Sequence, residues 1–523
     1  MGITTSQKMG VAALIMAGSV LLSRFMGLIR DKVVSWQFGA GAESDVYFSA
    51  FVVPEFLNHL LAGGYISITL IPLLAAAFKE NEDDGWRFFG TVLCWATAGI
   101  ILLTAVAWIA APNLAPLVAP GFTEAKLARL ASFLRIILPA QIFFLAGSCL
   151  TAILYIRKQF FVPALTPLVY NACIIAGGLL LPGHGMEGFC WGVLAGAALG
   201  AFVLPLWAVR RGAFRFIPGW WHKKLFKMAM LALPLMLGLS VTVMDEQFIR
   251  VFGTMAGDGA VSLLNYARRI MMVPVGVVAQ AAGVASFPFL AALVVKGDEK
   301  TFDDTLRRVL RASIYVVVPL CLLMIILSAP GLGVFFEGGR FSAGDTAQAA
   351  PLLQVMLLAV PFWTVQQVMG RAFYARQDTL TPAVVGTIVT GIVVCVYPFA
   401  VRSWGAPGVA GVSSGGMVLY TLALCAVWIR KRGRGVFSGL ARPLFSSLSI
   451  GCPAALAGSF VSCKLKPLSC LLADKAGEIF PVSAQVARHM IDIGVGGSIF
   501  AGCYIALAYL FAREALELGR KKF

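Results

Sequence analysis

"SRFMGLIRDKVVSWQFGAGAESDVYFSAFVVP", residues 23–54, joins two apolar stretches and carries charged side chains within them. The apolar segment 11–22 is followed by Ser23 and then by Arg24, and Arg30 comes six positions after Arg24. A charge at the centre of a bilayer costs about 2.5–3.5 kcal/mol even on the lenient insertion scales. The stretch therefore predicts a membrane span whose arginines meet an anionic group.

The composition of the chain is that of a polytopic membrane protein. Of its 523 residues, 59% are hydrophobic and 13% are charged, and the mean hydropathy is +0.85. The net charge of +17 could suggest a nucleic-acid partner. However, the basic residues lie mostly in short gaps between apolar stretches, where lipid headgroups and the insertion machinery recognise them, so we expect no nucleic acid. The cysteines are scattered without a Cys-x-x-Cys pair, which argues against a metal site.

Apolar stretches of about 20 residues, the length that crosses a bilayer, recur fourteen times and predict an all-α fold. The predicted spans are 10–36, 45–77, 88–111, 128–154, 163–182, 187–209, 226–250, 260–294, 309–329, 350–374, 381–400, 406–429, 443–462 and 489–512. Lys and Arg gather in alternate gaps, as in "RRGAFRFIPGWWHKKLFK" and "RKRGRG". The positive-inside rule then predicts that both termini are cytoplasmic.

Two pairs of short matches indicate an internal duplication. "IPLLAA" at 71–76 resembles "FPFLAA" at 287–292, and "LYIR" at 154–157 resembles "FYAR" at 373–376. The offsets of 216 and 219 residues cover six predicted spans, an even number, so both halves share one orientation. We expect two pseudo-symmetric six-helix lobes, followed by two additional helices; the expected boundaries are 1–212, 213–435 and 436–523.

Basic residues inside the predicted spans outnumber nearby acids, which predicts a positive interior that suits a phosphate or pyrophosphate group. The basic set is Arg24, Arg135, Arg268, Arg269 and Arg371, and the accompanying acids are Glu55, Asp245 and Glu246. Arg135 and Arg371 lie near span ends, and for these two we favour snorkelling towards the interface.

The first two predicted spans contain further polar positions. Arg24 and Arg30 lie about 120° apart around a helix, so a bend at Gly27 or the reach of the side chains would have to turn both towards one cavity. Asp31 is predicted to orient nearby arginines. Asp45 fits either a helix-start acid or a substrate contact. In the second span a polar stripe at i, i+3 and i+4 should face a cavity or another helix; it comprises Glu55, Asn58 and His59.

At this point several blocks in register resemble the MurJ (MviN) family of bacterial lipid II flippases. They are "SRFMGLIRD", "FGAGAESDVYFSAF", "IPLL", "APGF", "YARRIMMVPVGV", "GRFSAGD" and "FYARQDTLTP", in order through the first twelve spans. The resemblance implies a multi-pass protein of the bacterial inner membrane, with the fold of the multidrug/oligosaccharidyl-lipid/polysaccharide exporters. It also implies a cationic cavity between two six-helix lobes and a groove from the last two helices for a polyprenyl tail.

The resemblance also implies the substrate and its contacts. Arg24, Arg30 and Arg269 match the family's important arginines and would hold the pyrophosphate of undecaprenyl-pyrophosphate-linked disaccharide-pentapeptide during transport by alternating access. Asp45 matches the family's acid at the start of the second span. Membrane lipids and cell-wall synthesis enzymes are the further partners that it implies.

The chain departs from the family pattern in its second span. Where many relatives have an arginine, this chain has Asn58 or His59 close to Glu55, and Ala62-Gly63-Gly64 lacks the usual acid. Arg268 stands where many relatives have an acid, so it enters the candidate substrate set.

Several alternatives remain open at this stage. Some relatives bind sodium, and Asp245 is a weak cation candidate, although a structural pair with an arginine fits it equally well. No catalytic residue and no cofactor are expected, and coupling to the membrane potential or a monovalent cation is left open. The rival functions are a flippase for another polyprenyl-linked glycan, an ion-coupled multidrug exporter of the same superfamily, a membrane enzyme acting on polyprenyl phosphates and a non-transporting scaffold. An enzyme would need clustered acids or a nucleophile with a base.

Overall fold

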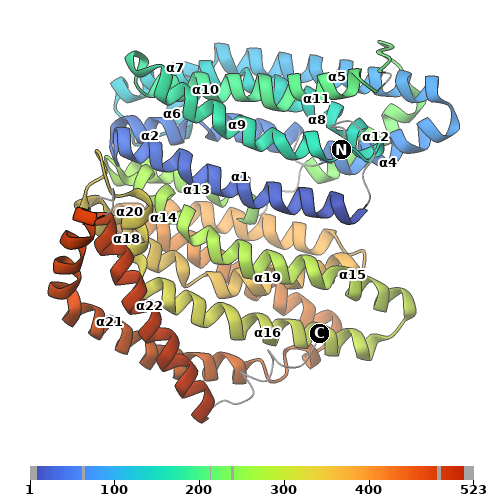
Figure 1. Ribbon diagram of the computed structural model, residues 1–523. Coiled ribbons are helices and arrows are strands. Elements are labelled where there is room, and N and C mark those ends of the chain that lie inside the picture. Colours follow the sequence, from blue (N-terminus) through green and yellow to red (C-terminus); the bar gives the residue numbers. More distant parts are fainter. Residues whose placement is uncertain (1–8, 62–64, 213, 237–240, 480–483, 512–523) are drawn as a thin grey trace. The chain divides into compact units, whose positions relative to one another are not determined.

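The computed structural model describes residues 9–61, 65–212, 214–236, 241–479 and 484–511. Within these ranges the chain is helical, apart from turns and one isolated bridge between Gly338 and Phe341 (Figure 1). It divides into two compact units, Met1–Gly238 and Leu239–Phe523. The predicted all-helical membrane fold is confirmed.

The first unit consists of twelve described α-helices with short 3-10 and π segments. Their bounds are α1 Met9–Phe38, α2 Ala42–Ser49, α3 Val52–Leu61, α4 Tyr65–Glu80, α5 Glu82–Ile109, α6 Ala111–Val118, α7 Glu124–Ile137, α8 Ala140–Ile156, α9 Phe161–Leu180, α10 Met186–Gly196, α11 Leu204–Arg210 and α12 Lys223–Met236.

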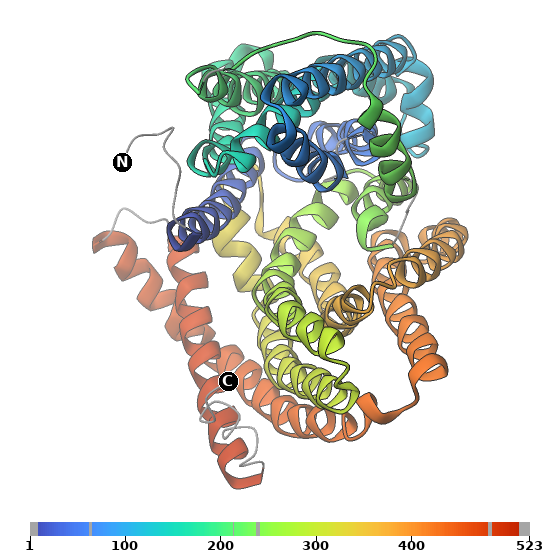
Figure 2. The same ribbon diagram turned by 90° about the vertical axis from the view of Figure 1, so that its right-hand side faces the viewer.

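The second unit contains the other described helices, and α20 is the longest of them (Figure 2). Their bounds are α13 Val241–Gly253, α14 Ala260–Pro274, α15 Ala281–Lys296, α16 Glu299–Ile326, α17 Ser328–Phe336, α18 Ala343–Leu357, α19 Val360–Ala375, α20 Leu380–Arg432, α21 Ala441–Ile479 and α22 Ala484–Phe511.

In the described residues, nine helices are long and apolar enough to cross a membrane, or ten if the bent pair α18 and α19 counts as one span. These correspond to eleven of the fourteen predicted spans, because α20 covers both 381–400 and 406–429. The other three predicted spans fall on α1, on α2 to α4, and on α12 with α13. The two units divide within this last one, and the three-part division at 212 and 435 stays a prediction.

Backbone features repeat at the offset that the sequence matches indicated. Lys158 and Gln377, 219 residues apart, are the described non-glycine residues with positive φ, at 56° and 61°. Gly185 and Gly405 share an unusual conformation, with φ of 55° and 59°, where α9 turns into α10 and where α20 turns back on itself. Two turn conformations of the first unit therefore recur in the second unit at this offset.

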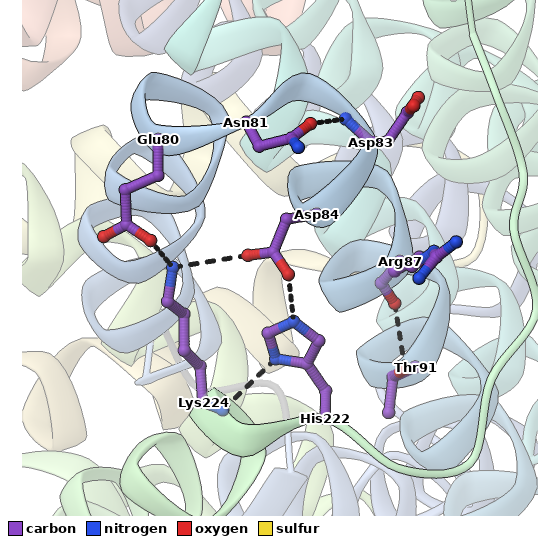
Figure 3. Close-up of polar contacts among 8 residues, drawn as sticks. All are labelled: Glu80, Asn81, Asp83, Asp84, Arg87, Thr91, His222 and Lys224. Carbon is purple, nitrogen blue, oxygen red and sulfur yellow. Dashed lines mark hydrogen bonds and ion pairs between the residues drawn. The ribbon is translucent and has the colours of Figure 1, made fainter.

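Ion pairs at one end of the first unit tie together α4, α5 and the start of α12. Figure 3 shows the Lys224 ammonium between two carboxylates, 2.7 Å from Glu80 Oε2 and 3.5 Å from Asp84 Oδ2. The other oxygen of Asp84 lies 3.2 Å from His222 Nε2. The hydrogen bond to Glu80 raises the pKa of Lys224, so the Lys224 ammonium is charged at neutral pH and the ion pair is present.

A second ion-pair cluster joins other helix ends of the same unit. Arg129 of α7 pairs with Glu43 of α2 at 3.3 Å and with Glu187 of α10. Glu43, Arg129 and Glu187 lie beside gaps that the alternation of spans assigns to one side of the membrane, opposite to the Lys224 cluster. The contacts therefore agree with the predicted alternation, while the choice of the cytoplasmic side stays a prediction.

The last two helices, α21 and α22, pack against each other and against α16 and α17 of the second unit (Figure 1). Ala454 and Phe500 are buried where α21 and α22 meet, and the partly buried Leu322 and Ile326 of α16 pack against them. This contact attaches both helices to one unit.

The segment "KGDEKTFDDTLRRVLR", residues 296–311, has helical spacing and mixed charge, which predict a solvated surface helix. The structure differs from this prediction. Glu299 instead begins the 28-residue helix α16, which continues directly into the predicted ninth span. Phe302, Leu306 and Leu310 recur every four residues and are buried against α19 and the end of α20. The apolar face of this segment therefore packs into the second unit.

Candidate functional site

Arg30 is held in place by neighbours from two helices of the first unit. Its Nε and Nη2 donate to Asp31 Oδ1 at 3.0 and 2.9 Å, and its Nη1 donates to Asn171 Oδ1 of α9 at 3.3 Å. The Asn171 amide donates in turn to the carbonyl of Pro167 at 2.8 Å, which fixes the orientation of its oxygen. Asp31 therefore orients an arginine, as the sequence analysis predicted.

This arrangement leaves the Arg30 guanidinium able to bind a further acceptor. Three of its five N–H groups are used by Asp31 and Asn171 within the described residues, and one hydrogen on each Nη nitrogen remains. The side chain retains 16% of its exposure, whereas that of Asp31 retains 3%. A pre-oriented guanidinium edge of this kind suits a phosphate oxygen pair.

The other predicted residues of the first unit lie on α1 to α3. Arg24 is exposed on α1, which runs unbroken through Gly27. Asp45 is fully buried in the first turn of α2, in keeping with its interpretation as a helix-start acid. The polar stripe on α3 is half-buried throughout and comprises Glu55, Asn58 and His59. The stretch 62–64, where the family's acid is missing, lies outside the described residues.

In the second unit, Asp245 and Arg268 form a buried ion pair between α13 and α14. Asp245 is 2% exposed and Arg268 is 5% exposed. Ser413 of α20 donates to the second oxygen of Asp245 at 2.6 Å, and Glu246 Oε2 lies 3.8 Å from Arg268 Nε. The structure therefore contains the arginine pair that the sequence analysis offered as the alternative to a cation site.

Arg269, the neighbour of Arg268, is half-buried on α14. Successive positions of a helix point about 100° apart, so the Arg269 side chain leaves α14 in a different direction from that of Arg268. The two adjacent arginines thus occupy different surroundings within one turn of helix. None of the described residues form a cluster of three or more His, Cys, Asp or Glu side chains that could hold a metal ion.

Arg135 and Arg371 each lie against an aromatic ring. The Arg135 guanidinium is 5.2 Å from the ring centre of Trp108, and Arg371 is 6.0 Å from that of Phe287. Arg135 is exposed and Arg371 is half-buried. Aromatic contacts of this kind stabilise a cation near a membrane interface and agree with the predicted snorkelling.

The sequence analysis missed the two side chains that complete these clusters, Asn171 and Ser413. Asn171 is a polar residue within the apolar span 163–182, and that signal could have marked it. Ser413 gives no such signal, because serine is common in membrane helices and its partner lies 168 residues away.

Comparison with protein families identifies one that covers most of the chain. A family model described as "Lipid II flippase MurJ" matches residues 34–465. A curated relative from Rhizobium meliloti, "Probable lipid II flippase MurJ", is 26% identical over 80% of this chain and 81% of its own length. Another with the same description, from Bdellovibrio bacteriovorus, is 23% identical over 98% of this chain and 96% of its own.

Solved structures show the same fold. "Lipid II flippase MurJ, inward closed conformation" aligns with a TM-score of 0.77 at 22% identity, covering 96% of this chain and all of that one. An inward-facing MATE multidrug resistance transporter of the MOP superfamily aligns with a TM-score of 0.65 at 14% identity, covering 82% of this chain and 99% of the transporter.

Proposed function

Because the chain belongs to the lipid II flippase MurJ family, we propose that it carries lipid II from the inner to the outer leaflet of the bacterial cytoplasmic membrane. It is a transporter and not an enzyme. The observation that carries the proposal is the family match over residues 34–465. The finer form of the substrate, an undecaprenyl-pyrophosphate-linked disaccharide-pentapeptide, is part of the same proposal.

Arg30 is the proposed contact for the pyrophosphate in the first unit. Its guanidinium is fixed by Asp31 and Asn171 and still offers two N–H groups. Asp31 compensates part of the charge, which lowers the cost of holding the arginine in a membrane span before the substrate arrives. Arg24, exposed on the same helix, is proposed to add charge for the headgroup.

Arg269 is the proposed contact in the second unit. Its neighbour Arg268 has its charge matched by the buried carboxylate of Asp245, so we assign Arg268 mainly a positioning role. The polar stripe of α3 is proposed to bind the sugar and peptide part of the substrate; the stripe is Glu55, Asn58 and His59. Asp45 is fully buried and is assigned to the start of α2 rather than to the substrate.

Transport by alternating access follows from the cost of moving a charged headgroup through hydrocarbon. A protein that exposes the bound headgroup to one side and then to the other avoids this cost, while the polyprenyl tail stays in lipid. We propose that both termini are cytoplasmic, which the distribution of Lys and Arg in the gaps supports.

Replacement of the resident flippase in a depleted bacterial strain tests the proposal. Expression of this chain should restore growth and the accessibility of lipid II at the outer leaflet. The control is the Arg30→Ala variant at the same membrane abundance. Failure of the confirmed, inserted wild-type chain to restore accessibility would contradict the lipid II assignment. Restored export of another polyprenyl-linked glycan would support the first alternative.

A multidrug exporter is the second alternative, because this chain shares its fold with the MATE transporter. Most cationic drugs favour an acidic cavity, whereas the proposed contacts here are arginines. Energy-dependent efflux of a cationic dye that persists in the Arg30→Ala and Arg269→Ala variants would favour this alternative over lipid II transport.

A further inference from the structure

The long helix α20 bends back on itself, and an open apolar cavity lies between its two arms. Gly405, with φ of 59°, is the turn between a first arm, 380–404, and a second arm, 406–432. The cavity has a volume of about 560 Å³, which lies within the range of about 300–1,000 Å³ common for ligand pockets. Its twelve lining residues all belong to these two arms. We call this cavity the slot.

The slot opens onto the surface that α20 presents to its surroundings. Ile392 and Val396 of the first arm line it and are 49% and 45% exposed, and Leu419 of the second arm is 40% exposed. Ile388, Ile392, Val396 and Phe399 follow one another at helical spacing and are all exposed large hydrophobics. An apolar exposed stripe on a membrane span faces lipid, so hydrocarbon reaches the slot.

The equivalent helix pair of the first unit shows that the repeat alone does not create such a space. There the backbones of α9 and α10 are in close contact at glycines. A Cβ added at Gly188 would lie 2.6 Å from the carbonyl oxygen of Gly177, and one added at Gly192 would lie 2.6 Å from the carbonyl oxygen of Cys173. In α20 the contact nearest to the turn is kept, where Gly408 packs on the backbone of Ala400. Added Cβ atoms at Gly411 and Gly415 would meet nothing within 4 Å.

The end of the slot beside the turn carries groups suited to a lipid headgroup. Trp404 lines the slot and is 70% exposed, as tryptophans at the membrane interface are. Arg402, two residues earlier, is exposed and makes no hydrogen bond or ion pair with another of the described residues. A cation at the interface beside an apolar slot is complementary to a lipid phosphate attached to an acyl chain.

We propose that the slot is a binding site for one acyl chain of a bilayer phospholipid, with the phosphate of that lipid at Arg402. The bound acyl chain fills the space between the two arms of α20 and completes the packing of the second unit. The proposal concerns a structural lipid and does not depend on the transported substrate.

Photolabelling in vesicles tests the proposal. The full chain is reconstituted in phosphatidylethanolamine and phosphatidylglycerol with a phosphatidylglycerol probe that carries a diazirine near the middle of one acyl chain. After irradiation, labelled peptides are located by mass spectrometry. We expect labels on the slot residues of both arms. The double variant Gly411→Leu/Gly415→Leu fills the slot without a backbone clash and should lose these labels.

Gly391→Leu is the matched control, because Gly391 lies on the same helix, is exposed, has open space around its Cβ position and does not line the slot. It should keep the labels. Arg402→Gln should lower labelling by the phosphatidylglycerol probe more than labelling by a phosphatidylethanolamine probe. Labels that persist in the double variant, or that disappear equally in both leucine variants, would overturn the proposal. Displacement by excess undecaprenyl phosphate, but not by phosphatidylglycerol, would assign the slot to an isoprenoid chain instead.

Discussion

Arg376 repeats, 219 residues later, the position and contacts of Arg157. Arg157 lies 3.8 Å from Glu82 at the start of α5 and 5.4 Å from the ring centre of Trp86. Arg376 pairs with Glu299 at the start of α16 and lies 4.2 Å from the ring centre of Phe302. In each unit, one arginine thus follows the fourth predicted span of that half and anchors the first turn of a helix. That helix carries the third predicted span of the same half.

The Arg376→Ala variant should be destabilised more than Arg157→Ala. The Arg376 side chain is 9% exposed against 30% for Arg157, and it also covers Trp428. We expect a loss of about 1–2 kcal/mol for Arg376→Ala and under about 1 kcal/mol for Arg157→Ala, since both glutamates are largely exposed. Thermal unfolding of the purified variants in one detergent measures the difference. Equal melting temperatures would contradict the argument.

Lys158 and Gln377 provide a matched test of backbone strain. A side chain with φ near +60° costs about 1–2 kcal/mol relative to the right-handed region, and glycine avoids this cost. Lys158→Gly and Gln377→Gly should therefore keep or raise the melting temperature, whereas the β-branched Lys158→Val and Gln377→Val should lower it. A glycine variant that unfolds earlier than its valine counterpart would show that side-chain contacts outweigh the strain.

Much of the fold could be predicted from the sequence, because span length, charged gaps and the repeat are local or periodic signals. The segment 296–311 shows the limit. Its charges predicted a solvated helix, but Phe302, Leu306 and Leu310 at i, i+4 and i+8 form a buried stripe whose partners lie on α19 and α20. Which face of a mixed helix packs depends on distant helices, and no local pattern specifies them.

The candidate site was predictable for residues whose chemistry is costly in a membrane. Arg30 and Arg268 were marked by their charge, and Asp31 and Asp245 were each expected to contact an arginine, without the sequence specifying which one. Asn171 and Ser413 were missed because a neutral polar side chain costs far less in a membrane than a charge. Their roles depend on the register between helices that are far apart in sequence.

The buried pair of Asp245 and Arg268 should behave as a unit. Removing one partner leaves an unmatched buried charge, so Asp245→Leu should lose about 3–5 kcal/mol. The double variant Asp245→Leu/Arg268→Met should regain much of this loss, because both charges are gone and the space is filled. Melting temperatures of the two single variants and the double variant complete the cycle. Additive losses would show that the two residues stabilise the unit independently.

The contacts of Asp378 predict that the stability of the fold depends on pH. Burial alone would raise its pKa, but hydrogen bonds from Lys431 and Thr381 outweigh this and hold the pKa below its usual value. A carboxyl with a lowered pKa stabilises the fold above its unfolded value of about 3.9, and the contribution is lost as the pH falls through the folded pKa. Asp378→Asn should therefore melt earlier than the wild type at pH 7, and the gap should narrow below about pH 4. A gap that stays constant down to pH 3 would contradict the ionic origin.

The last prediction separates binding by Arg30 and Arg269 from their contribution to folding. If both guanidinium groups hold the pyrophosphate, Arg30→Ala and Arg269→Ala should abolish lipid II accessibility at the outer leaflet although both variants still insert into the membrane. Arg269→Ala should melt close to the wild type, whereas Arg30→Ala should melt earlier because the buried Asp31 loses this ion pair. Arg30→Lys and Arg269→Lys should recover only part of the transport, because an ammonium keeps the charge but loses the planar fork that binds two oxygens.

Asn171→Ala should weaken transport less than Arg30→Ala, since Asp31 still holds Nε and Nη2 of Arg30. Arg135→Ala is the matched control, because Arg135 is an exposed span-end arginine over Trp108, and its loss should leave transport intact. Full complementation by Arg30→Ala and Arg269→Ala at native expression would remove both residues from the headgroup site.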